Sequence, residues 1–132
     1  MDETSAKKWK IGVVGPCASG KSTLIAGLNV ANIEFRHIAQ EHSYVPTMWK
    51  RLTNPDLLIF LDAAYAVTCR RRNLNWTDAE YAEQHRRLSH ARQYADLYIM
   101  TDNLSPEDVR TRVLDFLRSK QIMMFDSSSV SR

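Results

Sequence analysis

The chain has 132 residues, of which 44% are hydrophobic and 25% are charged. This length is typical of a single domain, and this composition can form a hydrophobic core without disulfide bonds or structural metal ions. No apolar run approaches the roughly 20 residues that a membrane-spanning helix needs, so we expect no membrane partner.

The formal net charge is only +3, and part of the basic charge is clustered at 70–72 and 86–87. Such a cluster suits a phosphate site at least as well as a nucleic-acid surface, which disfavours nucleic acid as a partner. The first ten residues contain no apolar signal-peptide segment. Cys17 and Cys69 are too few for a disulfide framework. These features favour a cytoplasmic location.

Apolar spacing and turn signals predict alternating strands and helices in the first half of the chain. The predicted elements are a strand over 11–14, a helix over 21–30, a strand over 34–40 and a short helix over 46–52. Pro46 suits the first turn of that short helix, where a missing N–H costs nothing.

The second half continues the alternation. It predicts a strand over 57–61 that stops at Asp62, helices over 64–72 and 78–94, a strand over 95–100 and a last helix that begins at 106. The strand over 57–61 is apolar throughout, which is typical of a central strand covered on both faces. Thr77 and Glu80 form a capping-box pattern that places the start of the long helix at Asp78.

This order predicts a three-layer α/β/α fold with a small, mostly parallel sheet of about four strands. We expect one domain over 1–120 and a flexible tail over 121–132. Ligands of such sheets bind beyond the carboxyl ends of the strands. Segments 15–22, 40–43 and 101–103 should therefore lie with Asp62 along one rim.

The most specific motif is the octapeptide Gly-Pro-Cys-Ala-Ser-Gly-Lys-Ser at 15–22, which fits the P-loop (Walker A) pattern G-x-x-x-x-G-K-[ST]. Glycines at its ends let the backbone wrap a phosphate with N–H groups pointing inward. The following helix turns its N-terminus toward the anion, Lys21 can reach the β- and γ-phosphates, and the Ser22 hydroxyl can ligate Mg²⁺. The expected nucleotide-binding residues are Gly15, Ala18, Ser19, Gly20, Lys21, Ser22 and Thr23, with ATP or another nucleoside triphosphate as ligand.

A P-loop needs a further acidic group for Mg²⁺. Asp62 ends the strongest predicted strand, and Glu41 follows the strand over 34–40. Either carboxylate could serve, or cap the next helix instead, so the predicted metal residues are Ser22, Asp62 and Glu41. The four histidines show no metal-ligand spacing, and Cys17 reads as a small residue at a variable loop position.

Three arginines, 70–72, close the helix that follows Asp62. They suit the negative end of the helix dipole, but one of them could also neutralise a transferring phosphoryl group. Consecutive helical residues point in different directions, so only one or two can face the site. Lys21, Asp62 and Arg71 are the predicted catalytic residues.

Together, "GVVGPCASGKST", "PDLLIFLDAAYAVTCRRR" and "ADLYIMTDNLSPEDVRTRVLDFL" resemble the small P-loop nucleoside and nucleotide kinases over most of residues 9–118. The resemblance implies that the arginines stand at the base of a mobile lid, and that 73–87 form this lid and the helix returning from it. Kinases of this family are longer and carry a fifth strand and an acceptor-binding region, for which only 41–56 is present here. Markers of switch GTPases are lacking.

The resemblance favours a minimal kinase that transfers the γ-phosphoryl group of Mg²⁺-ATP to a small acceptor such as a nucleoside or nucleotide. The short acceptor region keeps a second hypothesis open: a nucleoside-triphosphate-binding or slowly hydrolysing regulatory module without an acceptor. No aromatic-basic repeat supports a third, a nucleic-acid-associated ATPase. Homo-oligomerisation is left open.

Overall fold

The computed structural model describes residues 8–72 and 75–122. Its elements are β1 (Trp9–Val14), α1 (Lys21–Ala26), β2 (Ile33–His37), the 3₁₀ turn η2 (Gln40–His42), the π-helical turn η3 (Trp49–Thr53), β3 (Leu57–Asp62), α2 (Tyr65–Arg72), α3 (Asp78–Tyr94), β4 (Leu97–Met100) and α4 (Pro106–Ser119). Most of the expected tail, from 123 onward, lies outside the described residues, as do positions 73 and 74 of the expected lid.

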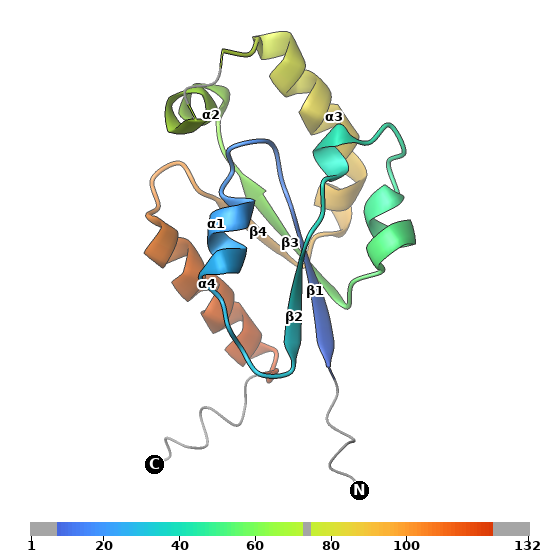
Figure 1. The fold of residues 1–132 in the computed structure, drawn as a ribbon, viewed down its shortest axis with the longest axis vertical. Coiled ribbons are helices and arrows are strands. Elements are labelled where there is room, and N and C mark those ends of the chain that lie inside the picture. Colours follow the sequence, from blue (N-terminus) through green and yellow to red (C-terminus); the bar gives the residue numbers. More distant parts are fainter. Residues whose placement is uncertain (1–7, 73–74, 123–132) are drawn as a thin grey trace, which may run out of the picture.

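The four strands form one sheet in the order β2-β1-β3-β4, and every pairing is parallel. The predicted fold class is therefore confirmed. Strand β3 lies between β1 and β4, and all its residues after Leu57 are buried. Because all four strands run the same way, their carboxyl ends meet at one edge, where the P-loop leaves β1 (Figure 1).

Helices cover both faces of the sheet (Figure 1). One core contains Ile59 and Leu61 of β3 with Leu24 of α1 and Val113 of α4. On the other face, alternate residues of β3, Leu58 and Phe60, pack with Trp49, Leu88 and Ala91. Successive strand residues point to opposite faces, so a strand that is apolar at every position joins the two cores into a three-layer structure.

Two predicted elements end earlier than expected. Helix α1 stops at Ala26, with Gly27 as its C-cap, where the side chain of Arg110 of α4 packs close to the glycine. Strand β2 stops at His37 rather than at residue 40. The chain then turns through η2, which carries Glu41 under α3 instead of along the strand direction.

Gln40 holds this turn in place and had no signal in the sequence. Its side chain is fully buried. Its amide nitrogen donates to the backbone oxygens of Val45 (2.9 Å) and Arg87 (3.2 Å), and its oxygen accepts from the Trp49 backbone N–H (2.8 Å). A buried polar group is stable only when such partners are made, so Gln40 ties the segment after β2 to α3 and η3.

The predicted capping box is present at Thr77 with Glu80, and the predicted helix start at Pro106 carries a second box, Ser105 with Asp108. The short helix expected over 46–52 is instead the π-helical turn η3, shifted to 49–53. Among the described residues, none of the helices combines the length and the apolar character required to cross a bilayer.

Candidate functional site

The P-loop leaves β1 at Val14 and enters α1 at Lys21. Three of its residues have positive φ angles: Gly15 (156°), Ala18 (66°) and Gly20 (101°). Left-handed backbone is costly for residues with a side chain, and such strain is often found at ligand sites. Ala18 adopts this unfavourable conformation and is buried. Packing against its neighbours therefore stabilises the curved shape of the loop.

The two glycines are required for different reasons. A Cβ at Gly15 would lie 2.1 Å from the carbonyl oxygen of Leu61 in β3, whereas a Cβ at Gly20 would meet nothing within 4 Å. We expect Gly15→Ala to lower the free energy of unfolding by about 3 kcal/mol or more, since the loop or β3 must move. Gly20→Ala should cost only about 1–2 kcal/mol, from its backbone angle. Urea unfolding of both variants tests this; equal losses would contradict the steric argument.

Lys21 points back into the loop and is 5% exposed. Its ammonium donates to the carbonyl oxygens of Gly15 (2.7 Å) and Pro16 (3.2 Å) and to Glu41 Oε2 (2.9 Å). Glu41 is 3% exposed, and its second oxygen, Oε1, has no hydrogen-bond partner within the described ranges. The structure thus brings Glu41, from the turn η2, against the P-loop lysine and leaves it with an unused buried oxygen.

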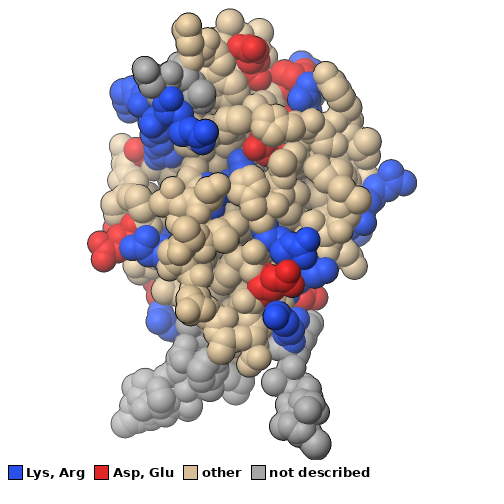
Figure 2. Space-filling model, in the orientation of Figure 1, with Lys and Arg blue, Asp and Glu red and all other residues tan. Residues whose placement is uncertain are grey.

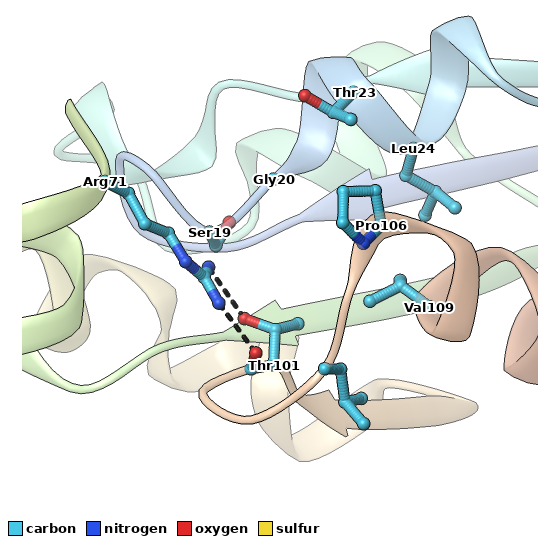
Figure 3. A pocket seen from close by; sticks show the side chains of 9 residues that line it. Ser19, Gly20, Thr23, Leu24, Arg71, Thr101, Pro106 and Val109 are labelled. Carbon is cyan, nitrogen blue, oxygen red and sulfur yellow. Dashed lines mark hydrogen bonds between the residues drawn. The ribbon is translucent and has the colours of Figure 1, made fainter.

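Of the three arginines at the end of α2, Arg71 is the one that contacts the P-loop. It donates to the carbonyl oxygen of Ala18 (3.2 Å), to Thr101 Oγ1 (2.9 Å) and to the carbonyl oxygen of Thr101 (2.6 Å). Arg70 is exposed and lines neither cavity of the site. Arg71 therefore joins α2, the P-loop and the end of β4, as Figure 3 shows.

Two cavities open along the P-loop. The larger, about 400 Å³, is lined mainly by polar and charged residues: Cys17, Ala18, Gly20, Lys21, Ser22, Thr23, His37, Glu41, His42, Arg71 and Arg72. Burial and the nearby Lys21 charge lower the pKa of His37. In Figure 2, lysine and arginine side chains gather over the end of α2, where Arg70, Arg71 and Arg72 lie. The larger cavity thus has positive charge on two sides, which suits an anion.

The smaller cavity, about 150 Å³, shares Gly20, Thr23 and Arg71 with the larger one and is mostly apolar (Figure 3). Leu104, Pro106 and Val109, from the start of α4 and the loop before it, form one wall with Leu24. Ser19, Gly20, Thr23 and Thr101 complete the lining. Arg71 borders both cavities, so a ligand that spans them would pass beside its guanidinium group.

Asp62 is buried but lines neither cavity. Its carboxylate accepts from Tyr98 Oη (2.5 Å) and from the Ala63 backbone N–H (2.9 Å), and His85 Nε2 lies 3.3 Å away. Burial alone would raise the pKa of Asp62, but the contacts with His85 and Tyr98 outweigh it and lower that pKa below its ordinary value of 3.8. Burial and the contact with Asp62 raise the pKa of Tyr98 to about 12. The described contacts of Asp62 join β3 to α3 and β4.

This pairing predicts a pH-dependent contribution to stability. Asp62→Asn replaces an acceptor of several hydrogen bonds by an amide that leaves one buried donor unpaired, which should cost about 1–3 kcal/mol at pH 7. Because the pKa of Asp62 is depressed in the folded state, its contribution is complete above about pH 4 and is lost as pH falls through the folded-state pKa. The free energy of unfolding of wild type, measured with urea, should therefore exceed that of Asp62→Asn by less in acid than at pH 7.

Asp115→Asn is the matched control, since Asp115 is exposed and pairs only across one turn with Arg118 among the described contacts. It should change stability little at either pH. If the free energies of unfolding of wild type and Asp62→Asn differ by the same amount at pH 7 and in acid, the depressed pKa of Asp62 is contradicted.

Two further residues shape the site: Thr101, which was expected on the rim but without a role, and Gln84, which was not predicted. Thr101 anchors Arg71, and it is 2% exposed with its hydroxyl donating to the Asp62 carbonyl oxygen (2.7 Å). Gln84 of α3 holds Cys17: its oxygen accepts from the Cys17 N–H (3.0 Å), and its nitrogen lies 3.2 Å from the Cys17 sulfur. Thr101 follows a strand at the ligand-binding edge, which is why its segment was expected on the rim, but nothing in the helical pattern of 78–94 marks residue 84.

No protein-family model matches the chain, and a search of curated proteins found no match. The function must therefore be inferred from the geometry of the site.

Proposed function

We propose that the chain binds a Mg²⁺-nucleoside triphosphate at the P-loop and acts as a minimal kinase on a small acceptor. The observation that carries this proposal is the buried contact of Lys21 with Glu41 inside a strand–loop–helix motif. A lysine held 2.7–3.2 Å from two loop carbonyl oxygens occupies the place where a cation would meet phosphate oxygens. A bound phosphate would draw this ammonium away from the carbonyls.

The residues around the loop fit a magnesium ion better on the Glu41 side than on the Asp62 side. Ser22 and Glu41 line the same cavity, and Glu41 retains an unpartnered oxygen. Asp62 has both oxygens engaged and lines no cavity. Hard cations prefer carboxylate and hydroxyl oxygens, so Ser22 and Glu41 would hold Mg²⁺, which would neutralise phosphate charge.

The smaller cavity suits the base of the nucleotide. Its apolar wall of Leu104, Pro106 and Val109 could pack on one side of a planar ring, and the Arg71 guanidinium lies at its border. Apolar pockets with a few polar groups are typical of base sites, and arginine stacks well on flat π-systems. The phosphates would then extend along the P-loop past Arg71 into the larger cavity.

Phosphoryl transfer asks mainly for positioning and charge neutralisation. Arg71 is held against the P-loop and lies between the two cavities, so it can neutralise charge on a transferring group. The larger cavity continues to His37 and His42, which offer polar groups to a small acceptor. These features favour a kinase over a module that only binds a nucleotide.

Two measurements test the proposal. In a thermal-shift titration, Mg²⁺-ATP or Mg²⁺-GTP should stabilise the protein, by about 2.7 kcal/mol at a concentration 100 times Kd. Incubation with γ-labelled nucleotide and a panel of nucleosides and nucleotides should then give a labelled product. No shift with any nucleoside triphosphate would refute nucleotide binding, while a shift with only free phosphate released would favour the regulatory module.

A further inference from the structure

The P-loop cysteine, Cys17, has no role in the proposed function, but it belongs to a cluster with Glu41 and His42. The sulfur of Cys17, a carboxylate oxygen of Glu41 and an imidazole nitrogen of His42 lie within 4.8 Å of one another. They come from two segments, the P-loop and the turn η2. All three residues line the larger cavity.

From this cluster we propose a zinc site at the mouth of the P-loop, with Cys17, Glu41 and His42 as protein ligands. Thiolate, imidazole and carboxylate are the groups that bind Zn²⁺, and three such ligands with an open fourth position are common. As thiolate, neutral imidazole and carboxylate, the set carries two negative charges, which match the charge of the ion. Mg²⁺ would not select a thiolate.

The distances already approach those of a tetrahedral site. His42 Nε2 lies 3.8 Å from Cys17 Sγ and 3.7 Å from Glu41 Oε2. Ligands in a tetrahedral zinc site are about 3.4–3.6 Å apart, given the usual bond lengths. The remaining pair, Cys17 Sγ and the Glu41 oxygen, lies within 4.8 Å. Because the His42 side chain is 59% exposed and Cys17 is a free thiol, side-chain movements of about 1 Å can close the site.

A second observation concerns the other oxygen of the same carboxylate. Glu41 is 3% exposed, and its Oε1 has no hydrogen-bond partner in the part of the chain that the structure describes. A buried carboxylate oxygen without a donor is costly, and a metal ion would relieve that cost. Gln84 already positions the cysteine, with its side-chain nitrogen 3.2 Å from the sulfur. Hydrogen bonds of this kind orient the ligands of metal sites.

Zinc at this site would compete with nucleotide. It would take the Glu41 carboxylate from Lys21 and fix the P-loop to η2 through Cys17, with loss of the thiol proton to solvent. This consequence rests on the proposed function, but zinc binding does not. We therefore expect the zinc affinity to be measurable without nucleotide, and zinc to reduce the thermal stabilisation given by Mg²⁺-ATP.

The test is a competition titration of the full chain with Zn²⁺ against a chromophoric chelator, with a phosphine reductant and no nucleotide. One equivalent should bind, and Cys17→Ser should weaken binding by at least about 100-fold, and His42→Ala by at least about 10-fold. Cys69→Ser, which removes the other free thiol, should bind as wild type does.

Cobalt gives an independent readout, because a thiolate ligand produces a charge-transfer absorption band that Cys17→Ser should abolish and Cys69→Ser should retain. The proposal would be overturned if wild type bound less than one equivalent of zinc, or if Cys17→Ser bound zinc as tightly as wild type. It would also be overturned if Cys17→Ser and Cys69→Ser lost the same zinc affinity. If zinc binds as expected but no nucleotide shifts the melting temperature, only the proposed function fails.

Discussion

Lys21→Ala is expected to abolish the thermal stabilisation that Mg²⁺-ATP gives the wild-type protein. The Lys21 ammonium is the cation buried inside the P-loop, 2.7 Å from the Gly15 carbonyl oxygen. Without it, the β- and γ-phosphate oxygens would lose the ammonium group that meets them inside the loop. Differential scanning fluorimetry across a nucleotide titration measures the effect. Lys8→Ala, which removes an exposed lysine before β1, should leave the response unchanged.

Lys21→Ala should also lower the free energy of unfolding, an effect that is separate from the loss of nucleotide binding. It leaves Glu41, which is 3% exposed, without its nearest cation, and breaking a buried ion pair costs about 3–5 kcal/mol. Removing both charges with Lys21→Met and Glu41→Gln should recover most of this stability. The double variant should still fail to respond to nucleotide, and a response like that of wild type would refute the role of Lys21.

Arg71→Ala is expected to lower the rate of γ-phosphoryl transfer by about 1,000-fold or more, the size of effect that an arginine finger supplies. The reason is its position: Arg71 is the member of the 70–72 run that touches the P-loop, and it borders both cavities. Initial rates with γ-labelled ATP, measured with the acceptor that the panel identifies or as phosphate release, give the comparison.

Arg70→Ala is the matched control, one residue away on the same helix but outside both cavities. It should retain the wild-type rate. Because Arg71 also donates to Ala18 and Thr101, its loss could loosen the loop. Arg71→Lys keeps the positive charge but lacks the planar guanidinium group. Its transfer rate should lie between those of Arg70→Ala and Arg71→Ala. Equal rates in Arg70→Ala and Arg71→Ala would contradict the assignment.

Much of the fold could be predicted because local signals determine it. Apolar runs placed the four strands, a capping box placed the start of α3, and a proline at the first helical position placed the start of α4. Errors occurred where tertiary contacts override local pattern. The sequence over 34–40 continues to look like a strand, but buried Gln40 makes three hydrogen bonds that require a turn.

The candidate site was only partly predictable, for a different physical reason. The P-loop is a contiguous motif, so its curved backbone could be expected. The choice between Glu41 and Asp62 could not be made, since both follow predicted strands and the sheet order is not encoded in periodicity. In the structure Lys21 contacts Glu41, while Asp62 turns toward His85 and Tyr98. The role of Asp62 in metal binding stays a prediction that this geometry does not favour.

The all-parallel sheet also has a consequence for how the protein acquires its site. Parallel neighbours need a crossover rather than a tight hairpin, so no two strands here can pair through a local turn. Proteins dominated by such non-local pairings fold more slowly than helical bundles. Thr101, which anchors Arg71, follows β4, the last strand to be synthesised. During translation, the P-loop would therefore emerge long before the residues that complete its cavity, and a competent site would form only once the C-terminal third of the chain has docked.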